Sequence, residues 1–317
     1  MNTLRIFIAG ASGALGRRLV PQLVARGHHV TGTTRSRTEE LRALGAEPVV
    51  LDPFDAAAVR DAVVRAEPDV VVHQLTALAG LGLGRNFDKA FALTNRLRTE
   101  GTDHLIAAAR ATGARRLVWQ SYAGWPYART GGPLKSEEDP LDPDPPADAR
   151  ATLAAIRHLE AAVIDARDME GVVLRYGGFY GPGTSIDEGG EHLELVRKRK
   201  FPVGGDGRGM WAFVHIDDAA AATVAAIEGG PPGIYNIVDD APAPVGEWLP
   251  ALAAKIGAPP PRRLPGWLVR LAAGPQAHSM MTRTRAASNA KAKRELGWRP
   301  THTLLGSVGR EVGVPVA

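Results

Sequence analysis

A glycine-rich turn near the start of the chain restricts the possible folds more than any other feature. The stretch "GASGALG" (10–16) follows an apolar run, "LRIFIAG" (4–10), and opens a helical pattern. Gly10 permits a tight turn, Gly13 lets the backbone approach a pyrophosphate, and Gly16 lets the helix lie close to the strand. Free N–H groups at the start of a helix bind such an anion. The spacing and context therefore predict a dinucleotide site here rather than a plain turn.

Strands and helices alternate through the first half of the chain. Near-continuous apolar runs such as "DVVVH" suit parallel strands that are buried on both faces. This alternation predicts an α/β fold, a Rossmann doubly wound parallel sheet. Strands are expected at 4–10, 28–35, 46–52, 69–77, 115–121 and 171–178, and helices at 15–27, 38–45, 55–66 and around 87–111.

The second half is less regular, and a loop rich in Pro, Gly and acidic residues is expected over 128–148. The simplest division is a dinucleotide-binding Rossmann domain over residues 1–175, completed by parts of 210–240. A smaller, mostly helical and discontinuous substrate-binding lobe then covers 176–317.

Composition excludes several classes of function. The 317 residues contain no cysteine, which excludes disulfides, thiolate metal sites and a cysteine nucleophile, and which fits the expected cytoplasmic location. The net charge is only +4, and the single dense basic run, "RKRK" (197–200), lacks interleaved aromatics, so no nucleic-acid partner is expected. No apolar run approaches the roughly 18 residues of a membrane span. No spacing typical of metal ligands is found, and no metal is expected.

The end of the second strand indicates which dinucleotide binds. It reads "TGTTRSR" (31–37), with Arg35 and Arg37 where an NAD site usually carries an acid. Because an arginine can pair with a 2′-phosphate, NADP(H) is favoured; the alternative is that Arg35 is simply an exposed surface residue. Asp52 can accept a hydrogen bond from the adenine amino group, and a turn or helix-cap role before Pro53 is the alternative.

At this point the chain resembles the extended short-chain dehydrogenase/reductase family, which includes NAD-dependent epimerases and dehydratases. The resemblance covers almost the full length, and its last three motifs are specific to the extended branch. It implies an N-terminal Rossmann domain, a small C-terminal substrate domain and an active site between them. The motifs are "GASGALG" (10–16), "DVVVHQLTA" (69–77), "RRLVWQSYAG" (115–124), "EEDPLDP" (137–143), "VVLRYGGFYGPG" (172–183), "FVHIDDAA" (213–220), "GIYNIVDD" (233–240) and "AKRELGWRP" (292–300).

The resemblance also implies roles for individual residues. Ser121 matches the family serine that hydrogen-bonds the substrate carbonyl or hydroxyl. Tyr176 stands where the family usually has a proline, at the start of the segment that lines the nicotinamide. The expected cofactor-binding residues are Gly10, Ser12, Gly13, Ala14, Leu15, Gly16, Arg35, Ser36, Asp52, Pro53, Leu75, Thr76, Tyr176 and Phe179.

The catalytic helix departs from the family pattern. The family carries Tyr-x-x-x-Lys on the helix after the serine strand, usually with a glutamate four residues past the lysine. In "RATLAAIRHLE" (150–160), Glu160 sets this frame, so Ile156 replaces the lysine and Thr152 replaces the tyrosine. The chain contains no Tyr-x-x-x-Lys at all. General acid–base help worth about 10²–10⁴ in rate is therefore missing, while cofactor positioning remains.

These features lead to a hypothesis and two alternatives. The hypothesis is an NADPH-dependent ketoreductase for a ketone of an aromatic polyketide-like small molecule, with the proton supplied by a substrate phenol or by water. The chain is similar in this respect to the angucyclinone ketoreductases of antibiotic-producing bacteria, such as that of the simocyclinone pathway. Ser121 would stabilise the developing alkoxide. Substrate contacts are expected from Tyr122, Trp125, Tyr180 and Trp211.

The first alternative is a non-catalytic NADP(H) sensor, which binds the cofactor and turns over no ketone. The second keeps the enzyme and moves its acid to Tyr122, Tyr127 or Tyr180, although packing with a satisfied hydroxyl is the commoner role of such residues. The sequence leaves the oligomeric state open.

Overall fold

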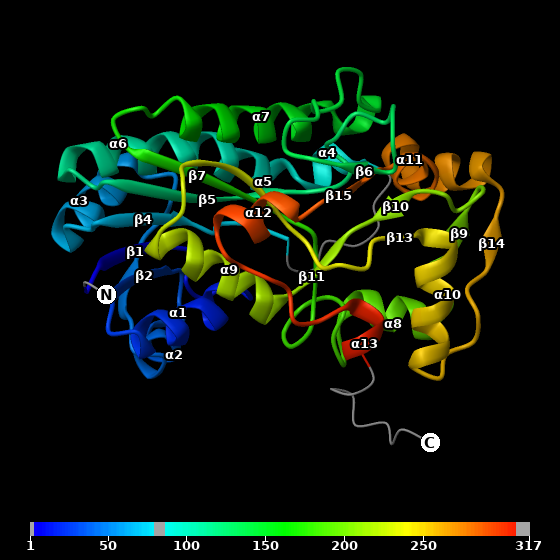
Figure 1. Cartoon of the computed structure of the whole chain (residues 1–317), viewed down its shortest axis with the longest axis horizontal. Coiled ribbons are helices and arrows are strands. Elements are labelled where there is room, and N and C mark those ends of the chain that lie inside the picture. Colours follow the sequence, from blue (N-terminus) through cyan, green and yellow to red (C-terminus); the bar gives the residue numbers. More distant parts are fainter. Residues whose placement is uncertain (1–2, 79–85, 309–317) are drawn as a thin grey trace.

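A seven-stranded parallel sheet forms the centre of the larger part of the molecule (Figure 1). The computed structural model of the chain describes residues 3–78 and 86–308. Every neighbouring pair in this sheet is parallel, which confirms the predicted doubly wound architecture. In spatial order the strands are β12 (Gly233–Ile237), β7 (Glu170–Tyr176), β5 (Arg116–Tyr122), β4 (Val70–His73), β1 (Arg5–Ala9), β2 (His29–Thr34) and β3 (Glu47–Val50).

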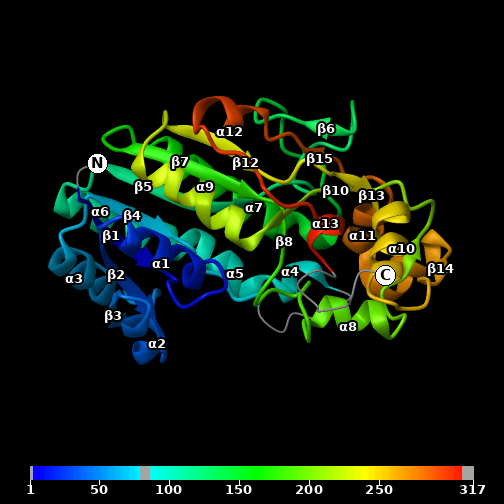
Figure 2. The same cartoon turned by 60° about the horizontal axis from the view of Figure 1, so that its bottom comes forward.

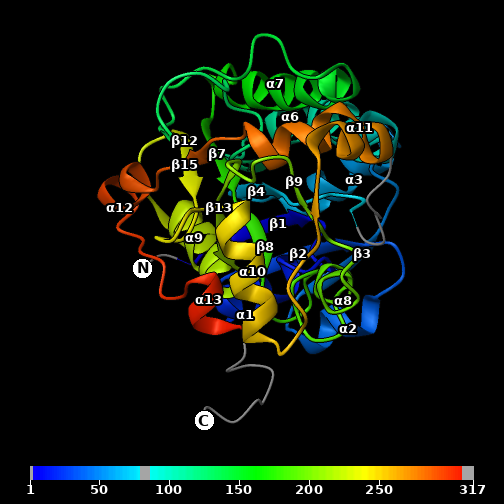
Figure 3. The ribbon, with the colours of Figure 1, turned by 90° about the vertical axis from the view of Figure 1, so that its right-hand side faces the viewer.

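Helices cover both faces of the sheet, as the end-on view in Figure 3 shows. One face carries α1 (Gly16–Ala25), α2 (Thr38–Ala43) and α9 (Ile216–Glu228); the other carries α3 (Ala56–Ala66), α6 (Thr102–Thr112) and α7 (Arg150–Ile164). All four residues of β4 are buried, with Val70 and Val72 facing the α1 side and Val71 facing the α6 side. This two-sided burial explains the unbroken apolar run in the sequence.

The helical stretch expected around 87–111 is divided into segments. These are α4 (Phe87–Ala90), α5 (Ala92–Arg96), a π-helical turn (Leu97–Gly101) and α6. Thr99 donates its hydroxyl to the Asn95 carbonyl at 3.1 Å, a bond that competes with the regular helical ladder. Arg98, which lies within this wider turn, is buried.

A smaller group of elements lies beyond the carboxyl ends of the strands. Its apolar core surrounds Trp248, Phe201 and Phe213. The helices are α8 (Glu191–Arg197), α10 (Val245–Lys255), α11 (Gly266–Thr282) and α13 (Leu304–Ser307), whereas α12 (Ala290–Glu295) packs against β12 at the edge of the main sheet. Short strands pair as β6 (Leu134–Lys135) with β15 (Ala286–Ala287), β8 (Gly178–Tyr180) with β11 (Phe213–His215), β9 (Val203–Gly204) with β14 (Arg263–Leu264), and β10 (Met210–Trp211) with β13 (Ala243–Pro244). After α12 the chain runs back along the molecule to α13, beside α10 (Figure 2).

One sequence expectation needs correction at the level of elements. The strand expected over 69–77 ends at His73, because the chain then turns across the glycine loop and leaves the sheet. The helix α9 is capped by His215, whose side chain accepts from the Asp217 N–H. Across residues 3–78 and 86–308, no helix combines the length and apolar character that crossing a membrane requires.

Candidate functional site

The glycine loop has a backbone that only glycine permits at two positions. Gly10 has a φ of +93°, and a Cβ there would lie 2.8 Å from the Gln74 backbone. A Cβ at Gly16 would lie 2.3 Å from the Ala11 carbonyl oxygen. The loop therefore lies directly against the start of the 74–78 segment, which brings the predicted cofactor residues Leu75 and Thr76 next to it.

The loop also offers unused hydrogen-bond donors. In the described part of the chain the N–H groups of Ala14 and Leu15 have no acceptor, and Gly13 is exposed. These N–H groups stand at the start of α1, where the helix dipole favours an anion. The residues present thus fit the pyrophosphate of a dinucleotide. A cavity of about 280 Å³ opens beside them and is lined by Ala14, Arg17, Arg18, Pro182 and Gly183.

The end of β2 is hydrogen-bonded to the glycine loop, and the residues that follow it include the exposed arginines Arg35 and Arg37. Gly10 donates its N–H to Thr33 Oγ1 at 2.9 Å. Thr34 Oγ1 accepts from the N–H groups of Ser36 at 3.3 Å and Arg37 at 3.0 Å, which bends the chain so that residues 35–37 are all exposed.

A third arginine lies next to this corner and was missed by sequence analysis. Arg17 and Arg37 both approach Glu40, with N···O distances of 3.4 and 3.5 Å. Arg17 directly follows Gly16 in the sequence. That position at the first turn of α1 was the available signal.

Asp52 stabilises a turn, which is one of the two roles expected for it from the sequence. Its Oδ1 accepts from the Phe54 N–H at 3.0 Å, while Asp55 caps α3. Its side chain is exposed, and the adenine contact of Asp52 and Pro53 stays a prediction.

The catalytic helix α7 presents no acid to the site. Thr152, at the tyrosine position, donates its hydroxyl to Asp88 Oδ1 at 2.7 Å and accepts from Asn95 Nδ2 at 3.0 Å. Asp88 also accepts from the N–H groups of Ala151 and Thr152, so it serves as the cap that α7 otherwise lacks. The Thr152 hydroxyl is therefore part of the anchoring of the helix.

Ile156, at the lysine position, is fully buried. It forms an apolar cluster with Trp125, Ala149 and Leu153, and Tyr122 packs against this cluster. An aliphatic side chain in this surrounding neither holds a positive charge nor moves a proton.

Ser121 is committed to a buried ion pair. Its hydroxyl donates to Glu160 Oε1 at 2.7 Å, and Arg175 binds both oxygens of the same carboxylate at 2.8 and 2.7 Å. Although burial lowers the pKa of Arg175, its hydrogen bonds to Glu160 outweigh this effect and raise the pKa overall. In this arrangement the Ser121 hydroxyl cannot also donate to a substrate carbonyl, and its predicted catalytic role requires it to leave Glu160.

Tyr127 belongs to the same buried network. It donates to Asn236 Oδ1 at 2.7 Å and accepts from Arg175 at 2.8 Å. Burial raises the pKa of its phenol to about 12. A phenol held this firmly, with a raised pKa, is poorly suited to replace the missing acid.

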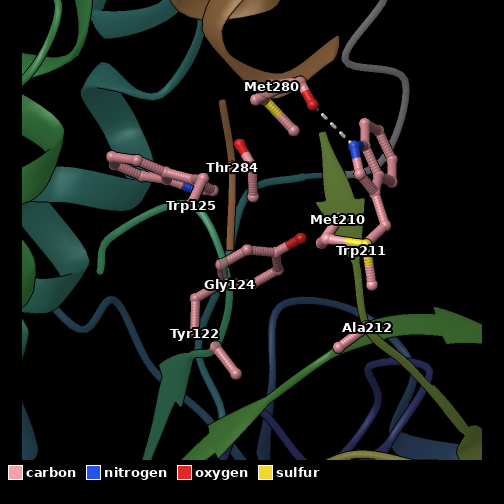
Figure 4. Close-up of a pocket in the computed structure, with 9 residues that line it drawn as sticks. Tyr122, Gly124, Trp125, Met210, Trp211, Ala212, Met280 and Thr284 are labelled. Carbon is pink, nitrogen blue, oxygen red and sulfur yellow. Dashed lines mark hydrogen bonds between the residues drawn. The ribbon is translucent and has the colours of Figure 1, made fainter. Parts of the chain in front are cut away.

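Three of the predicted substrate contacts meet around one small cavity (Figure 4). Tyr122, Trp125 and Trp211 line it, and the Trp211 indole donates to the Met280 carbonyl at 2.9 Å. The space amounts to about 10 Å³, which holds no more than one water molecule. Sequence analysis missed the remaining lining residues, Ala123, Gly124, Met210, Ala212, Met280 and Thr284, since neither methionine carries a local signal.

Tyr180 and Tyr176 point into protein instead. Tyr180 is fully buried, 5.2 Å from the His215 ring, and is not among the residues that line the cavity. Tyr176 shares a 2.6 Å hydrogen bond with Thr223 on α9, while the Phe179 ring lies 5.3 Å from it and is partly buried. The nicotinamide role of Tyr176 and Phe179 stays a prediction.

Comparison with known proteins finds a matching family and similar reductases that cover most of the chain. The sequence profile of the NAD dependent epimerase/dehydratase family matches residues 6–238. A 3-diazoavenalumate denitrifying reductase from a Streptomyces species is 45% identical over 97% of this chain and 100% of its own length. A 2-alkyl-3-oxoalkanoate reductase from Stenotrophomonas maltophilia is 32% identical over 81% of this chain and 77% of its own.

Among solved structures, the UDP-glucose 4-epimerase of Thermus thermophilus, in complex with NAD, superposes with a TM-score of 0.74. It is 24% identical, over 98% of each chain. At this identity the likeness concerns the fold.

Proposed function

This chain belongs to the NAD dependent epimerase/dehydratase family, and we propose that it is an NADP(H)-dependent reductase of an aromatic small molecule that takes no proton from α7. One observation carries the proposal: the buried face of α7 presents Thr152, bound to Asp88, and Ile156, packed in an apolar cluster. The relatives named reductases, which cover most of the chain, support an oxidoreductase.

The cofactor would be held by the glycine loop and the end of β2. The free N–H groups of Ala14 and Leu15 suit the pyrophosphate, and Arg35 and Arg37, with Arg17 nearby, suit a 2′-phosphate. NADPH, when bound, supplies a hydride. The acceptor must therefore be reactive without help from a tyrosine–lysine pair.

A ketone next to a phenol meets this requirement. The phenol donates an internal hydrogen bond to the alkoxide as it forms, and water restores the proton afterwards. The relative that acts on a 3-oxo acid supports a ketone. Tyr122, Trp125 and Trp211 offer an aromatic ligand flat apolar surfaces, and Met210 and Met280 are flexible enough to open the narrow cavity.

A second acceptor, an aryl diazo compound, is favoured by the 45% identical relative whose name describes a denitrifying reductase. In the net reaction an arenediazonium ion and NADPH give the arene, N₂ and NADP⁺. The C–N bond breaks, its electron pair leaves with N₂, and the hydride supplies the new C–H bond, so that charge and atoms balance. This reaction consumes no proton, which agrees with an α7 that has none to give.

The test is NADPH oxidation by the purified protein with three acceptors: a peri-hydroxy aryl ketone, its methyl ether and a hydroxyarenediazonium salt. We expect turnover of the hydroxy ketone or the diazonium salt and none of the ether. Thr152→Val, which removes the hydroxyl and keeps the shape, should leave the rate within a few-fold. Undiminished turnover of the ether, or a loss of about 10² with T152V, contradicts the proposal, because general acid–base help has that size. Tight NADPH binding with no turnover of any acceptor would instead indicate the sensor.

A further inference from the structure

Glu40, in the first turn of α2, lies between two arginines that come from different elements. Its Oε1 lies 3.4 Å from Nη1 of Arg17, in the first turn of α1, and its Oε2 lies 3.5 Å from Nη1 of Arg37, in the turn that follows β2. One carboxylate therefore holds two cations, with one oxygen toward each. A phosphate group with two of its oxygens in these places would meet the same two cations.

Both arginines border the predicted cofactor site. Arg17 lines the cavity of about 280 Å³ beside the glycine loop. It reaches across to the far wall of this cavity, where a Cβ at Gly183 would lie 3.3 Å from Arg17 Nη2. Arg37 follows the end of β2, the point at which dinucleotide-binding folds hold the ribose of the adenosine. The Glu40 oxygens thus lie where an anion at the adenosine end of the cofactor would lie.

The two ion pairs of Glu40 are long and lie at the surface. Hydrogen bonds between a guanidinium and a carboxylate are typically about 2.7–2.9 Å long, and the pair of Arg96 with Glu100 has this length, at 2.7 Å. The contacts of Glu40 are 3.4 and 3.5 Å long, and its side chain is 36% exposed. Because exposed pairs stabilise a protein little, Glu40 can turn into solvent and release both arginines at small cost.

From this geometry we infer that the Glu40 carboxylate occupies the place of the cofactor's 2′-phosphate and competes with it for Arg17 and Arg37. The inference rests on the NADP(H) dependence in the proposed function and adds a residue that sets the preference between the two cofactors. A phosphate carries more negative charge than a carboxylate and has a third oxygen, so it displaces Glu40. NAD(H) has a hydroxyl at this position and leaves Glu40 in place. Glu40 therefore lowers the affinity for NADP(H) alone.

Calorimetric titration of the purified protein with NADP⁺ and NAD⁺ tests the inference without any hydride transfer. Because the two ligands differ only in the 2′-phosphate, the ratio of their Kd values isolates the effect of this group. Glu40→Gln should tighten NADP⁺ binding about three- to fivefold, the upper part of the range for exposed ion pairs, since two pairs are released. It should leave NAD⁺ binding unchanged. Unchanged or weaker NADP⁺ binding, or equal tightening of both ligands, overturns the inference.

Glu39→Gln is the matched control. Glu39 is the neighbouring acid of α2, its side chain is 83% exposed, and it pairs with Arg42. The loss of its charge should therefore change neither Kd. If E39Q tightened NADP⁺ binding as much as E40Q, the gain would come from the general loss of negative charge, and the specific role of Glu40 would be refuted.

Arg17 provides a second, independent measurement. Arg17→Gln should weaken NADP⁺ binding at least about fivefold, the effect of losing a charge-assisted hydrogen bond at a partly exposed site, and NAD⁺ binding by less than about twofold. Arg18→Gln removes a neighbour that lines the same cavity but pairs with Asp217 at 3.5 Å, and it should keep the ratio of the two Kd values. Equal losses of both ligands in R17Q would place Arg17 on the pyrophosphate and overturn the inference. A wild-type preference for NAD⁺ would refute the NADP(H) dependence of the proposed function, while the change of the ratio in E40Q would still decide the role of Glu40.

Discussion

Replacing Glu160 with glutamine tests whether its buried negative charge stabilises the folded protein through Ser121 of β5 and Arg175 of β7. Glu160 and Arg175 have side-chain exposures of 7% and 4%, and the carboxylate accepts three hydrogen bonds, from Ser121 and twice from Arg175. Glutamine keeps the shape but turns an NH₂ group toward one of these donors. Removing one partner of a buried ion pair costs about 3–5 kcal/mol, because the other charge is left uncompensated. Arg98 also loses its nearby carboxylate, so the upper half of this range is expected.

The matched control is Glu170→Gln. Glu170 pairs with Arg116 at 2.5 Å, but its side chain is 51% exposed, and Arg116 keeps three carbonyl acceptors. An exposed partner is worth about 0–1 kcal/mol. At roughly 2 °C per kcal/mol, thermal unfolding followed by circular dichroism should show a Tm drop of roughly 8–10 °C for E160Q and at most about 2 °C for E170Q. Equal and small drops in both variants would refute the reasoning that the Glu160 charge stabilises the site.

Three further predictions use other parts of the structure. Asp88→Asn should destabilise the protein by about 1–2 kcal/mol, since it weakens the cap of α7; a Tm equal to that of wild type would contradict this role. Arg35→Ala should weaken NADPH binding at least tenfold and leave NADH binding unchanged, whereas Arg42→Ala should affect neither; titration of nicotinamide fluorescence distinguishes them. Asp239, whose pKa burial raises to about 6, binds its proton more tightly when folded, so stability should fall as pH rises from about 4 to 6. In a pH series of Tm values, Asp239→Asn should lack this component of the slope, and an unchanged slope would contradict it.

Features set by local backbone geometry could be predicted from the sequence. Gly10 and Gly16 need conformations and clearances that only glycine offers, so their spacing predicts both the turn and the anion site. The four-residue steps from Glu160 back to Ile156 and Thr152 place all three on one helix face, and all three are buried as the frame requires.

Side-chain partners brought together by the tertiary fold were harder to predict. Leu117 and Trp119 of β5 pack on the α6–α7 side, and Ser121 has the same parity, so strand alternation directs it toward Glu160 and away from an open site. The two-residue alternation of side chains along β5 would have placed Ser121 on the face that α7 covers, where Glu160 lies. Arg98 shows the opposite case: a basic residue in a helical pattern is typical of an exposed face, and the π-helical turn that buries it has no clear sequence signal.

The buried face of α7 limits the chemistry that the proposed reductase can perform. Ile156 packs with Trp125 and Leu153 in an apolar cluster, and the Thr152 hydroxyl is bound to Asp88. Neither side chain can give up or take a proton in this arrangement. A site of this kind favours acceptors that bring their own activating group, and it disfavours the oxidation of a simple alcohol, which must lose a proton to a base that α7 lacks.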